Sequence, residues 1–248
     1  MITRKSAAEI ATMRRAGRVV AEVLALVEEE LRPGVSTARL DALAEEHIRK
    51  AGATPSFKGY YGYPSSICIS VDREVVHGIP GDRVIRDGQV VSIDAGAIID
   101  GYHGDAARTF VVGDAPQPAR DLVETTRRAL EAGIAAARPG NRIWDVSAAV
   151  EDVALAHGYG IVRPYVGHGI GTAMHEEPQV PNYRTKTRGI ELAPGICIAI
   201  EPMLTLGSAD VETLADGWTV VTRDGSLAAH WEDTVAVTEQ GPEVLTRP

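Results

Sequence analysis

Hydrophobic residues recur at helical spacing along the first part of the chain. Ser6 followed by Glu9 is a capping-box pattern, so we expect a long amphipathic helix to begin there and to end before Pro33-Gly34. The same periodicity predicts a second helix over residues 36–52. The apolar positions that carry both predictions are Ile10, Met13, Val20, Val23, Leu24, Val27, Leu31, Leu40, Leu43 and Ile48.

The pattern then changes to the alternation typical of strands. Ile67 and Ile69 predict a strand that ends in a turn at Asp72-Arg73. In the stretch VVSIDAGAIIDGYHGDAARTF, residues 90–110, the central Asp100-Gly101 pair favours a type I′ turn, because both residues tolerate positive φ. We therefore expect a hairpin with this pair at its tip.

The predicted hairpin brings two carboxylates together. Asp105 faces Gly96 across the hairpin, and Asp94 projects from the same face. The strand before the turn is otherwise apolar, so this face should be at least half buried, where unpaired carboxylates are costly. Because Gly96 leaves room on the face, we predict a cation or a pair of cations there. The alternative is that the two Asp side chains flank an exposed turn and meet only water.

After Gly113 the helical pattern begins again. A helix predicted over residues 118–137 ends in Arg138-Pro139-Gly140, just as the first helix ends in Arg32-Pro33-Gly34, an offset of 106 residues. The same offset carries the second helix onto residues 142–158, which close with a glycine as well. The chain therefore reads as two similar halves.

The repeat predicts the fold class. The offset places Glu201, after a shift of one residue, at the position of Asp94 in the other half. We expect one catalytic α+β domain over residues 1–248, an antiparallel sheet covered by helices, with pseudo-twofold halves at about 1–115 and 116–248. Such an axis would bring the two acidic strands together. The alternative is that the RPG tripeptide recurs by chance after two helices.

Further candidate residues lie in the second half. The segment GHGIGTAMHEEPQV contains His168 and His175, and its glycines indicate a close approach of the backbone to another group. Residues 218–238 are predicted to form a hairpin that turns at Asp224-Gly225 and returns with Glu232. Alternation alone does not decide which face of that strand is buried. We expect Glu232 to face the acidic strands.

The candidate ligands form a hard, oxygen-rich set of four carboxylates and one imidazole. Such a set suits Mn, Fe, Co or Zn in pairs better than a structural zinc ion. Two divalent ions need bridging carboxylates and lower the pKa of a shared water towards neutrality, and that water would be the nucleophile. The five residues are Asp94, Asp105, His168, Glu201 and Glu232.

Two other histidines lie near these candidates in the sequence. We place His103 on the hairpin face opposite Asp94, either as a packing residue or as a residue that supports a ligand. His230 shares the alternation of Glu232, which would allow it to touch the site, but we do not expect such a contact.

Composition excludes several classes of function. The chain has 248 residues, 44% of them hydrophobic, a formal net charge of −9 and no basic run, which argues against a nucleic-acid surface. It has no apolar stretch long enough to span a bilayer and no secretory signal, so we expect a cytoplasmic protein with no membrane partner. Cys68 and Cys197 are expected to be buried, reduced thiols.

Six short motifs follow one another along the chain. They are VVHGIP, SIDAGAIIDGYHGD, GHGIG, HEEPQV, AIEPM and WEDT. Together they resemble, in the same order and over nearly the whole length, the motifs of type I methionine aminopeptidases of the pita-bread fold. The resemblance implies removal of an N-terminal methionine when the second residue is small.

The resemblance also implies roles for the candidate residues. Asp105 and Glu232 would bridge two divalent ions (Co, Mn, Fe or Zn), and Asp94 would bind one ion through both oxygens. His168 and Glu201 would complete the other ion. The groups counted as catalytic are His77, His175 and Glu201, with both imidazoles unliganded.

A pocket for the methionine side chain is implied as well. Phe57 stands where many bacterial relatives have Cys, and Met174 stands where Phe is common. Both are large and apolar, so we expect an altered inhibitor profile and a retained preference for methionine. The residues expected to bind substrate are Tyr60, Tyr63, Cys68, His77, Met174, His175 and Trp218.

The implied partners are the N-termini of nascent polypeptides, with a transient contact to the ribosome, and we expect a monomer. Two alternative functions remain. An Xaa-Pro aminopeptidase or prolidase uses the same ligands but carries an extra N-terminal domain, for which the chain has no room. A noncatalytic binding protein of this fold characteristically loses ligands, whereas all five are present here.

Overall fold

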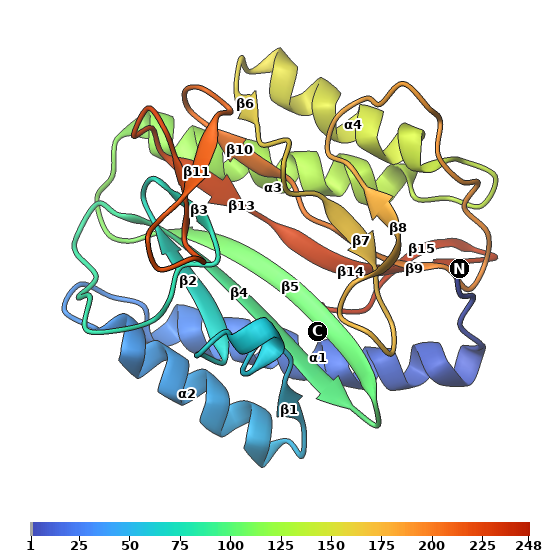
Figure 1. Ribbon diagram of the computed structural model, residues 1–248, viewed down its shortest axis with the longest axis horizontal. Coiled ribbons are helices and arrows are strands. Elements are labelled where there is room, and N and C mark those ends of the chain that lie inside the picture. Colours follow the sequence, from blue (N-terminus) through green and yellow to red (C-terminus); the bar gives the residue numbers. More distant parts are fainter. Residues whose placement is uncertain (1) are drawn as a thin grey trace.

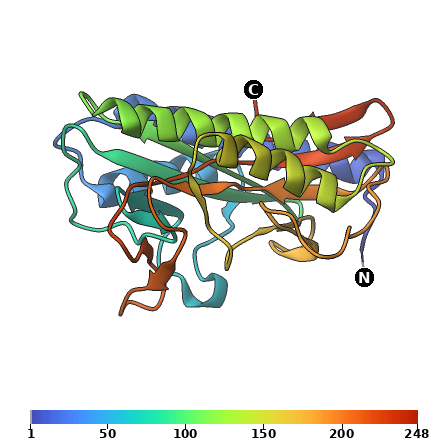
Figure 2. The ribbon, with the colours of Figure 1, turned by 90° about the horizontal axis from the view of Figure 1, so that it is seen from above.

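The computed structural model describes residues 2–248. A curled antiparallel sheet carries helices on its outer face, while short strands and loops gather on the other face (Figures 1 and 2). Helices α1 and α3 pack on the sheet, and α2 and α4 lie beside them. The helices are α1 (Ala7–Glu30), α2 (Thr37–Lys50), α3 (Gln117–Ala136) and α4 (Ile143–Ala156), with a short 3₁₀ helix η1 (Tyr60–Gly62).

The strands pair antiparallel throughout. The large sheet runs in the order β1-β4-β5-β14-β9-β7-β8, with β2 on β4 and β15 on β14; β13-β10-β6 and β11-β12-β3 form smaller sheets. The strands are β1 (Thr54–Pro55), β2 (Ile67–Val71), β3 (Glu74–Val76), β4 (Val90–Ile99), β5 (Tyr102–Val111), β6 (Gly160–Ile161), β7 (Gly167–Gly169), β8 (Glu176–Val180), β9 (Cys197–Ile200), β10 (Met203–Thr205), β11 (Val211–Thr213), β12 (Val220–Thr222), β13 (Ala228–His230), β14 (Glu232–Thr238) and β15 (Gly241–Val244).

The first helix forms as its sequence predicts. The Ser6 hydroxyl accepts from the Glu9 backbone N–H, and the Glu9 carboxylate accepts from the Ser6 N–H, so the capping box is complete. The predicted apolar face is buried against β4 and β5. Local capping and the 3.6-residue period therefore agree with the tertiary packing of this helix.

The central hairpin also has its predicted register. Asp100 and Gly101 form the tip with φ of 48° and 80°, the left-handed region that favours this pair. Gly96 faces Asp105, and Ile99 faces Tyr102. The turn thus sets which side chains share the inner face of the hairpin.

The buried apolar residues form two main clusters, one in each half of the chain. One runs from Ala16 to Val112 between α1, α2 and β4, and the other runs from Leu122 to Val237 between α3, α4, β9 and β14. Both lie on the helical side of the sheet, whereas a smaller apolar cluster that contains Tyr63 and Trp218 packs separately from them. The predicted α+β class, an antiparallel sheet covered by helices, is confirmed.

The hairpin predicted over residues 218–238 is wrong. The chain does turn near Asp224, but β12 pairs with β11 and β3, whereas β13 pairs with β10. The Asp224 carboxylate accepts from the backbone of Ser208 and Ser226, so the turn is tied to a neighbouring loop. β12 and β13 therefore belong to two different sheets.

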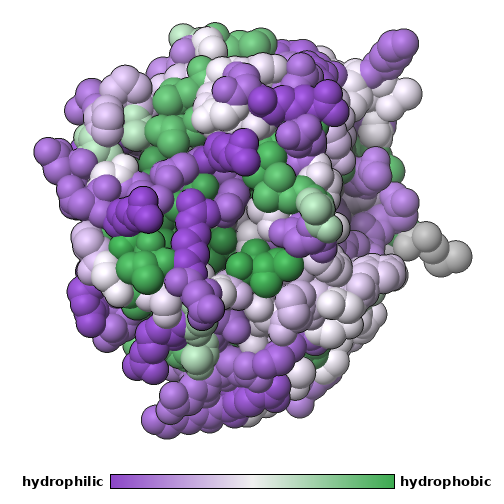
Figure 3. All heavy atoms as spheres, turned by 60° about the vertical axis from the view of Figure 1, so that its left-hand side comes forward, coloured by the Kyte–Doolittle hydropathy of each residue, from purple (hydrophilic) through white to green (hydrophobic). Residues whose placement is uncertain are grey.

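Two expectations from composition concern the described residues. Cys68 and Cys197 are buried and unbridged, as predicted. Among residues 2–248, no helix has the length and apolar character needed to cross a bilayer. On the face drawn in Figure 3, hydrophobic residues form separate patches among hydrophilic ones.

Candidate metal centre

A row of side chains crosses the inner face of the large sheet. Asp94 of β4 pairs with Ala107 of β5, which in turn pairs with Glu232 of β14. The register of β14 with β9 brings Glu201, the residue immediately after β9, beside Glu232. Three carboxylates, one from the middle of β4 and two from the ends of β14 and β9, therefore lie along one line, with the small Ala107 between two of them.

A second row lies two residues away and points to the same side, because side chains alternate along a strand. Asp105 donates its backbone N–H to the Thr234 hydroxyl at 3.0 Å. Thr234 pairs with Ala199 of β9, and Ala199 pairs with His168 of β7. Together the two rows collect all five predicted ligand candidates on one face.

Three of the candidate ligands, Asp105, His168 and Glu232, are buried, and Asp94 and Glu201 are partly buried. Their distances suit a shared cation. His168 Nε2 is 3.6 Å from Glu201 Oε1 and 3.9 Å from Asp105 Oδ2. Within residues 2–248, the buried atoms Asp94 Oδ1, Asp105 Oδ1 and Glu232 Oε1 have no hydrogen-bond partner. Buried carboxylate oxygens without donors are rare and costly, so divalent cations fit this set of atoms.

Electrostatics lead to the same conclusion. Burial raises the pKa of Asp94 to about 7. Burial, together with the neighbouring carboxylates, raises the pKa values of Asp105, Glu201 and Glu232 above their ordinary values. A bound divalent cation removes this penalty and keeps all four groups ionised.

The prediction that Gly96 leaves room for cations is wrong. A Cβ at position 96 would lie 2.8 Å from Ser56 Cβ and 2.9 Å from the Phe57 ring, so the space above Gly96 is filled. The glycine admits the segment that contains β1, which pairs with β4. The room for cations lies farther along the rows.

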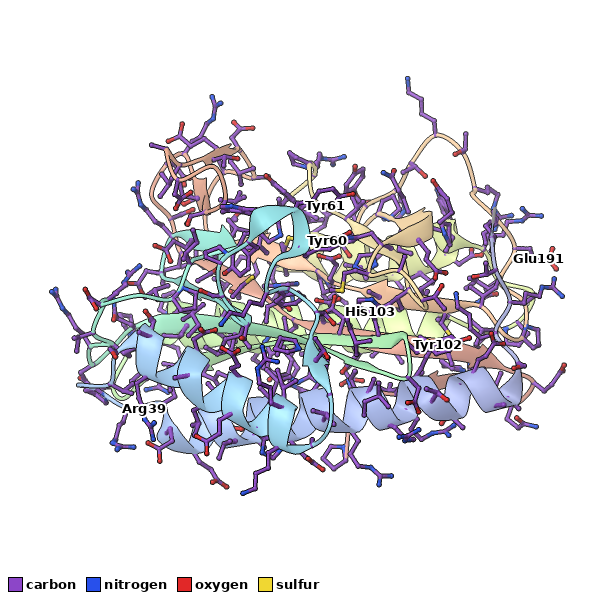
Figure 4. The ribbon with its side chains drawn as sticks, turned by 60° about the horizontal axis from the view of Figure 1, so that its bottom comes forward. Arg39, Tyr60, Tyr61, Tyr102, His103 and Glu191 are labelled. Atoms are coloured by element: carbon purple, nitrogen blue, oxygen red, sulfur yellow. The ribbon has the colours of Figure 1, made fainter. Side chains whose placement is uncertain are left out.

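The placement of His103 is also wrong. The side chains of His103 and Asp105 point to the same face of β5, because the two residues are two positions apart. His103 Nδ1 lies 3.0 Å from the Ser56 hydroxyl that covers Gly96. Figure 4 shows His103 on the hairpin, below the loop that carries Tyr60 and Tyr61. The expectation placed His103 on the opposite face by mistake.

The two histidines expected to be catalytic lie beside the carboxylates. The His175 ring centroid is 4.3 Å from that of His168, and His175 Nδ1 is 2.8 Å from the Tyr60 hydroxyl. His77 has φ of 61°, an unusual conformation for a residue other than glycine. Burial, with a smaller effect of His175, lowers the pKa of His77 to about 4, so its imidazole is neutral at pH 7.

One cavity of about 290 Å³ joins these groups to an apolar wall. The wall is a separate hydrophobic cluster in which Tyr63 and Trp218 meet edge to face at 5.1 Å. Its remaining members are Phe57, Tyr60, Cys68, Ile79 and Met174. The residues expected to bind substrate therefore line the same cavity as the carboxylates.

Sequence reasoning missed or undervalued three residues of this region. Tyr61 and Tyr165 line the cavity, and no motif singled them out. His230 is buried, with Nε2 within 3.8 Å of both Glu201 and Glu232, although it was not expected to touch the site. Its alternation with Glu232 was the signal that could have identified it.

The N-terminal segment holds the loop that carries His175. Lys5 Nζ donates to Glu176 Oε2 at 2.6 Å and to the Thr3 hydroxyl at 2.7 Å. The other Glu176 oxygen accepts from the Ala173 N–H at 3.2 Å. Because the Lys5 side chain is only 5% exposed and that of Glu176 13%, removing the lysine would leave the carboxylate largely buried without its cation, which costs more than breaking a surface pair.

Replacing Lys5 with Met should therefore slow turnover while leaving metal content unchanged. The apolar stem is kept, but Glu176 loses its cation and the loop before it loosens, so we expect kcat to fall roughly tenfold, or about 1.4 kcal/mol of barrier. The matched control is Arg14→Met, which breaks the pair between Arg14 of α1 and Glu243 of β15, neither of which lines the cavity. Equal kcat values for the two variants would contradict this role of Lys5.

The chain is similar to known proteins in both sequence and structure. It is 51% identical to the methionine aminopeptidase of Clostridium acetobutylicum over 247 residues, 99% of each chain. It superposes on the crystal structure of methionine aminopeptidase from Thermotoga maritima with a TM-score of 0.98 and 42% identity over 100% of both chains. The prolidase from Pyrococcus furiosus has a TM-score of 0.80 and 26% identity, and the chain covers 65% of that protein.

These likenesses confirm the pita-bread fold that the six motifs implied. The profile of metallopeptidase family M24 matches residues 11–239. Given this match over most of its length, the chain belongs to metallopeptidase family M24.

Proposed function

We propose that the chain is a metal-dependent aminopeptidase that removes an N-terminal methionine. The observation that carries the proposal is one cavity with two unlike walls, an acidic wall with imidazoles and an apolar wall of aromatic and sulfur-containing side chains. A peptide in this cavity would place its first side chain in the apolar half and its first carbonyl in the acidic half. The relative in Clostridium acetobutylicum, named methionine aminopeptidase, supports the same activity.

The acidic half would hold two divalent ions. Asp105 and Glu232 would bridge them, Asp94 would bind one through both oxygens, and His168 with Glu201 would complete the other. Bound ions of this kind polarise a carbonyl and lower the pKa of a water that serves as the nucleophile. The donors are compatible with Co, Mn, Fe or Zn. Metal analysis of protein purified without added ions, paired with an activity titration, tests both the number and the identity of the bound ions.

The side chains that would handle the scissile peptide are His175, Glu201 and His77. The Tyr60 hydroxyl holds His175 at Nδ1, which leaves Nε2 for a hydrogen bond to the carbonyl oxygen of the substrate. The Glu201 carboxylate would accept the proton released by the attacking water. His77 lies on the cavity wall and would hold the peptide near the scissile bond.

The apolar half would bind the methionine side chain. Tyr63, Cys68 and Met174 are almost fully buried there, and Trp218 and Tyr60 close the sides. A thioether gains from contact with aromatic edges as well as from burial. Phe57 adds volume on this wall, which supports an altered inhibitor profile with methionine still preferred.

Substrates with a small second residue should be cut fastest. A cavity of about 290 Å³ is at the lower end for ligand sites, so it holds a methionine side chain and little beyond it. We expect kcat/KM for a Met-Ala peptide to exceed that for an otherwise identical Met-Leu peptide by roughly 10²-fold. The measurement is steady-state kinetics on the two peptides. Similar values would show that the second position is open.

Hydrolysis assays distinguish the alternatives. Met-Gly-Met-Ser and an Xaa-Pro peptide are compared in the presence of Mn or Co, and we expect cleavage of the first alone. Preferred cleavage of the Xaa-Pro peptide would identify a prolidase-like enzyme. Cleavage of neither, with metal bound, would favour a noncatalytic binding protein.

The proposal extends to the setting of the reaction. The substrates would be new polypeptides with a free N-terminus, cut in the cytoplasm during or soon after synthesis, with a transient contact to the ribosome. The protein would act as a monomer, because ligands from both halves of one chain, residues 1–115 and 116–248, form the site of a single catalytic domain. Sedimentation and ribosome pelleting test these two points.

A further inference from the structure

His230 is a buried histidine whose ring faces the carboxylates of the metal centre. It is 2% exposed at the end of β13. The backbone is fixed on both sides, because its N–H donates to the Thr109 hydroxyl at 2.9 Å and its carbonyl accepts from that hydroxyl at 2.6 Å. The position of the His230 backbone is therefore set by the fold.

The ring nitrogen points at two carboxylates without bonding to either. His230 Nε2 lies 3.8 Å from Glu201 Oε2 and 3.7 Å from Glu232 Oε2. A charge-assisted hydrogen bond would be near 2.8 Å, so neither contact is one. Nε2 has no hydrogen-bond partner among residues 2–248, although buried nitrogens of this kind are nearly always bonded.

The same spacing marks the ligand candidate His168. Its Nε2 stands 3.6 Å and 3.9 Å from two carboxylate oxygens, so the two imidazoles relate to the carboxylates in the same way. Two triads result, Asp105 with His168 and Glu232, and Glu201 with His230 and Glu232, each with donor atoms within 4.8 Å of one another. Each triad has one imidazole and two carboxylates, and Glu232 belongs to both.

We propose that His230 is a sixth donor of the metal centre, which binds a divalent ion through Nε2 on the side of Glu201 and Glu232. The proposal rests on the proposed dinuclear site and adds a ligand to it. It adds a second nitrogen beside Glu201 and Glu232, so the centre offers four carboxylates and two nitrogens.

A second nitrogen changes which ions the centre prefers. Imidazole suits the later first-row ions, whereas carboxylates suit Mn, and Co²⁺ lies above Mn²⁺ in the general order of affinity for nitrogen and oxygen ligands. Removal of His230 should therefore weaken Co²⁺ binding more than Mn²⁺ binding. A role in packing or in hydrogen bonding would not separate the two ions in this way.

The test compares His230→Gln and His230→Ala with the wild-type protein. The control is His103→Gln, which changes a buried histidine already bonded to Ser56. Metal-free proteins are titrated with Co²⁺ and with Mn²⁺ by calorimetry, and the visible spectrum of the Co²⁺ form reports its ligands. Circular dichroism confirms that each variant is folded. We expect both His230 variants to lose about tenfold or more in Co²⁺ affinity at one site, with a smaller loss for Mn²⁺ and an altered spectrum.

Two outcomes would overturn the assignment. Wild-type Co²⁺ affinity and spectrum in both variants would show that His230 binds no metal. Wild-type values in His230→Gln alone would show that it acts as a hydrogen-bond donor instead. If the wild-type protein itself bound no Co²⁺, the proposed metal centre would fail, and that result is distinct from the failure of His230 as a ligand.

Discussion

Replacing Asp105 or Glu232 with Ala should remove at least one metal ion and nearly all turnover. Both residues lie in the middle of the rows, Asp105 beside Thr234 and Glu232 beside Ala107. A ligand shared by two ions affects both when it is lost, so we expect kcat to fall by at least about 10³-fold. Loss of a carboxylate from the edge of the rows would affect one ion only.

Metal stoichiometry and steady-state kinetics measure this effect. The control is Asp100→Asn at the tip of the same hairpin, where the side chain is exposed and Asn tolerates the positive φ. The metal-free Asp105→Ala protein should unfold no earlier than the metal-free wild type, because a repelled buried carboxylate has been removed. Full metal content with a near-normal rate in either alanine variant would end the dinuclear proposal.

His175→Ala should keep its metal and lose turnover, whereas His168→Ala should lose metal. The two rings are neighbours, but His168 Nε2 faces carboxylates while His175 is held by the Tyr60 hydroxyl. His175 would donate to the carbonyl oxygen of the substrate as negative charge develops, an interaction strongest in the transition state. We expect kcat of His175→Ala to fall roughly 10²–10³-fold, about 2.7–4 kcal/mol, with a smaller change in KM.

Added metal separates the two histidines. Excess metal should partly restore activity to His168→Ala and leave His175→Ala unchanged. Tyr60→Phe provides a further comparison, because it removes the hydroxyl at His175 Nδ1 while the ring stays, and it should reduce kcat less than His175→Ala. Loss of metal from His175→Ala, or its rescue by excess metal, would mean that the two imidazoles have been assigned wrongly.

The sequence by itself determined the local elements and the central hairpin. The capping box at Ser6 and the left-handed pair Asp100-Gly101 act within a few residues, so their consequences can be counted along the chain. The convergence of Asp94 and Asp105 followed from the same local register. Strand alternation, the internal repeat and the glycine-rich segment around His168 supplied the five ligand candidates. The resemblance of the motifs supplied their roles and the residues of the methionine pocket.

Only the tertiary structure decided how the strands of the second half pair. Glu201 and His168 reach Asp105 through β14 and β9, whose register is set by packing between segments far apart in the sequence. The strand partners of residues 218–238 were mistaken for this reason, because a turn signal does not specify which sheet each strand joins. The occupant of the space above Gly96 and the place of His230 between two carboxylates likewise depend on contacts that no local pattern encodes. Periodicity fixes the face of a strand that a side chain occupies, whereas the neighbours on that face are chosen by the packing of the whole chain.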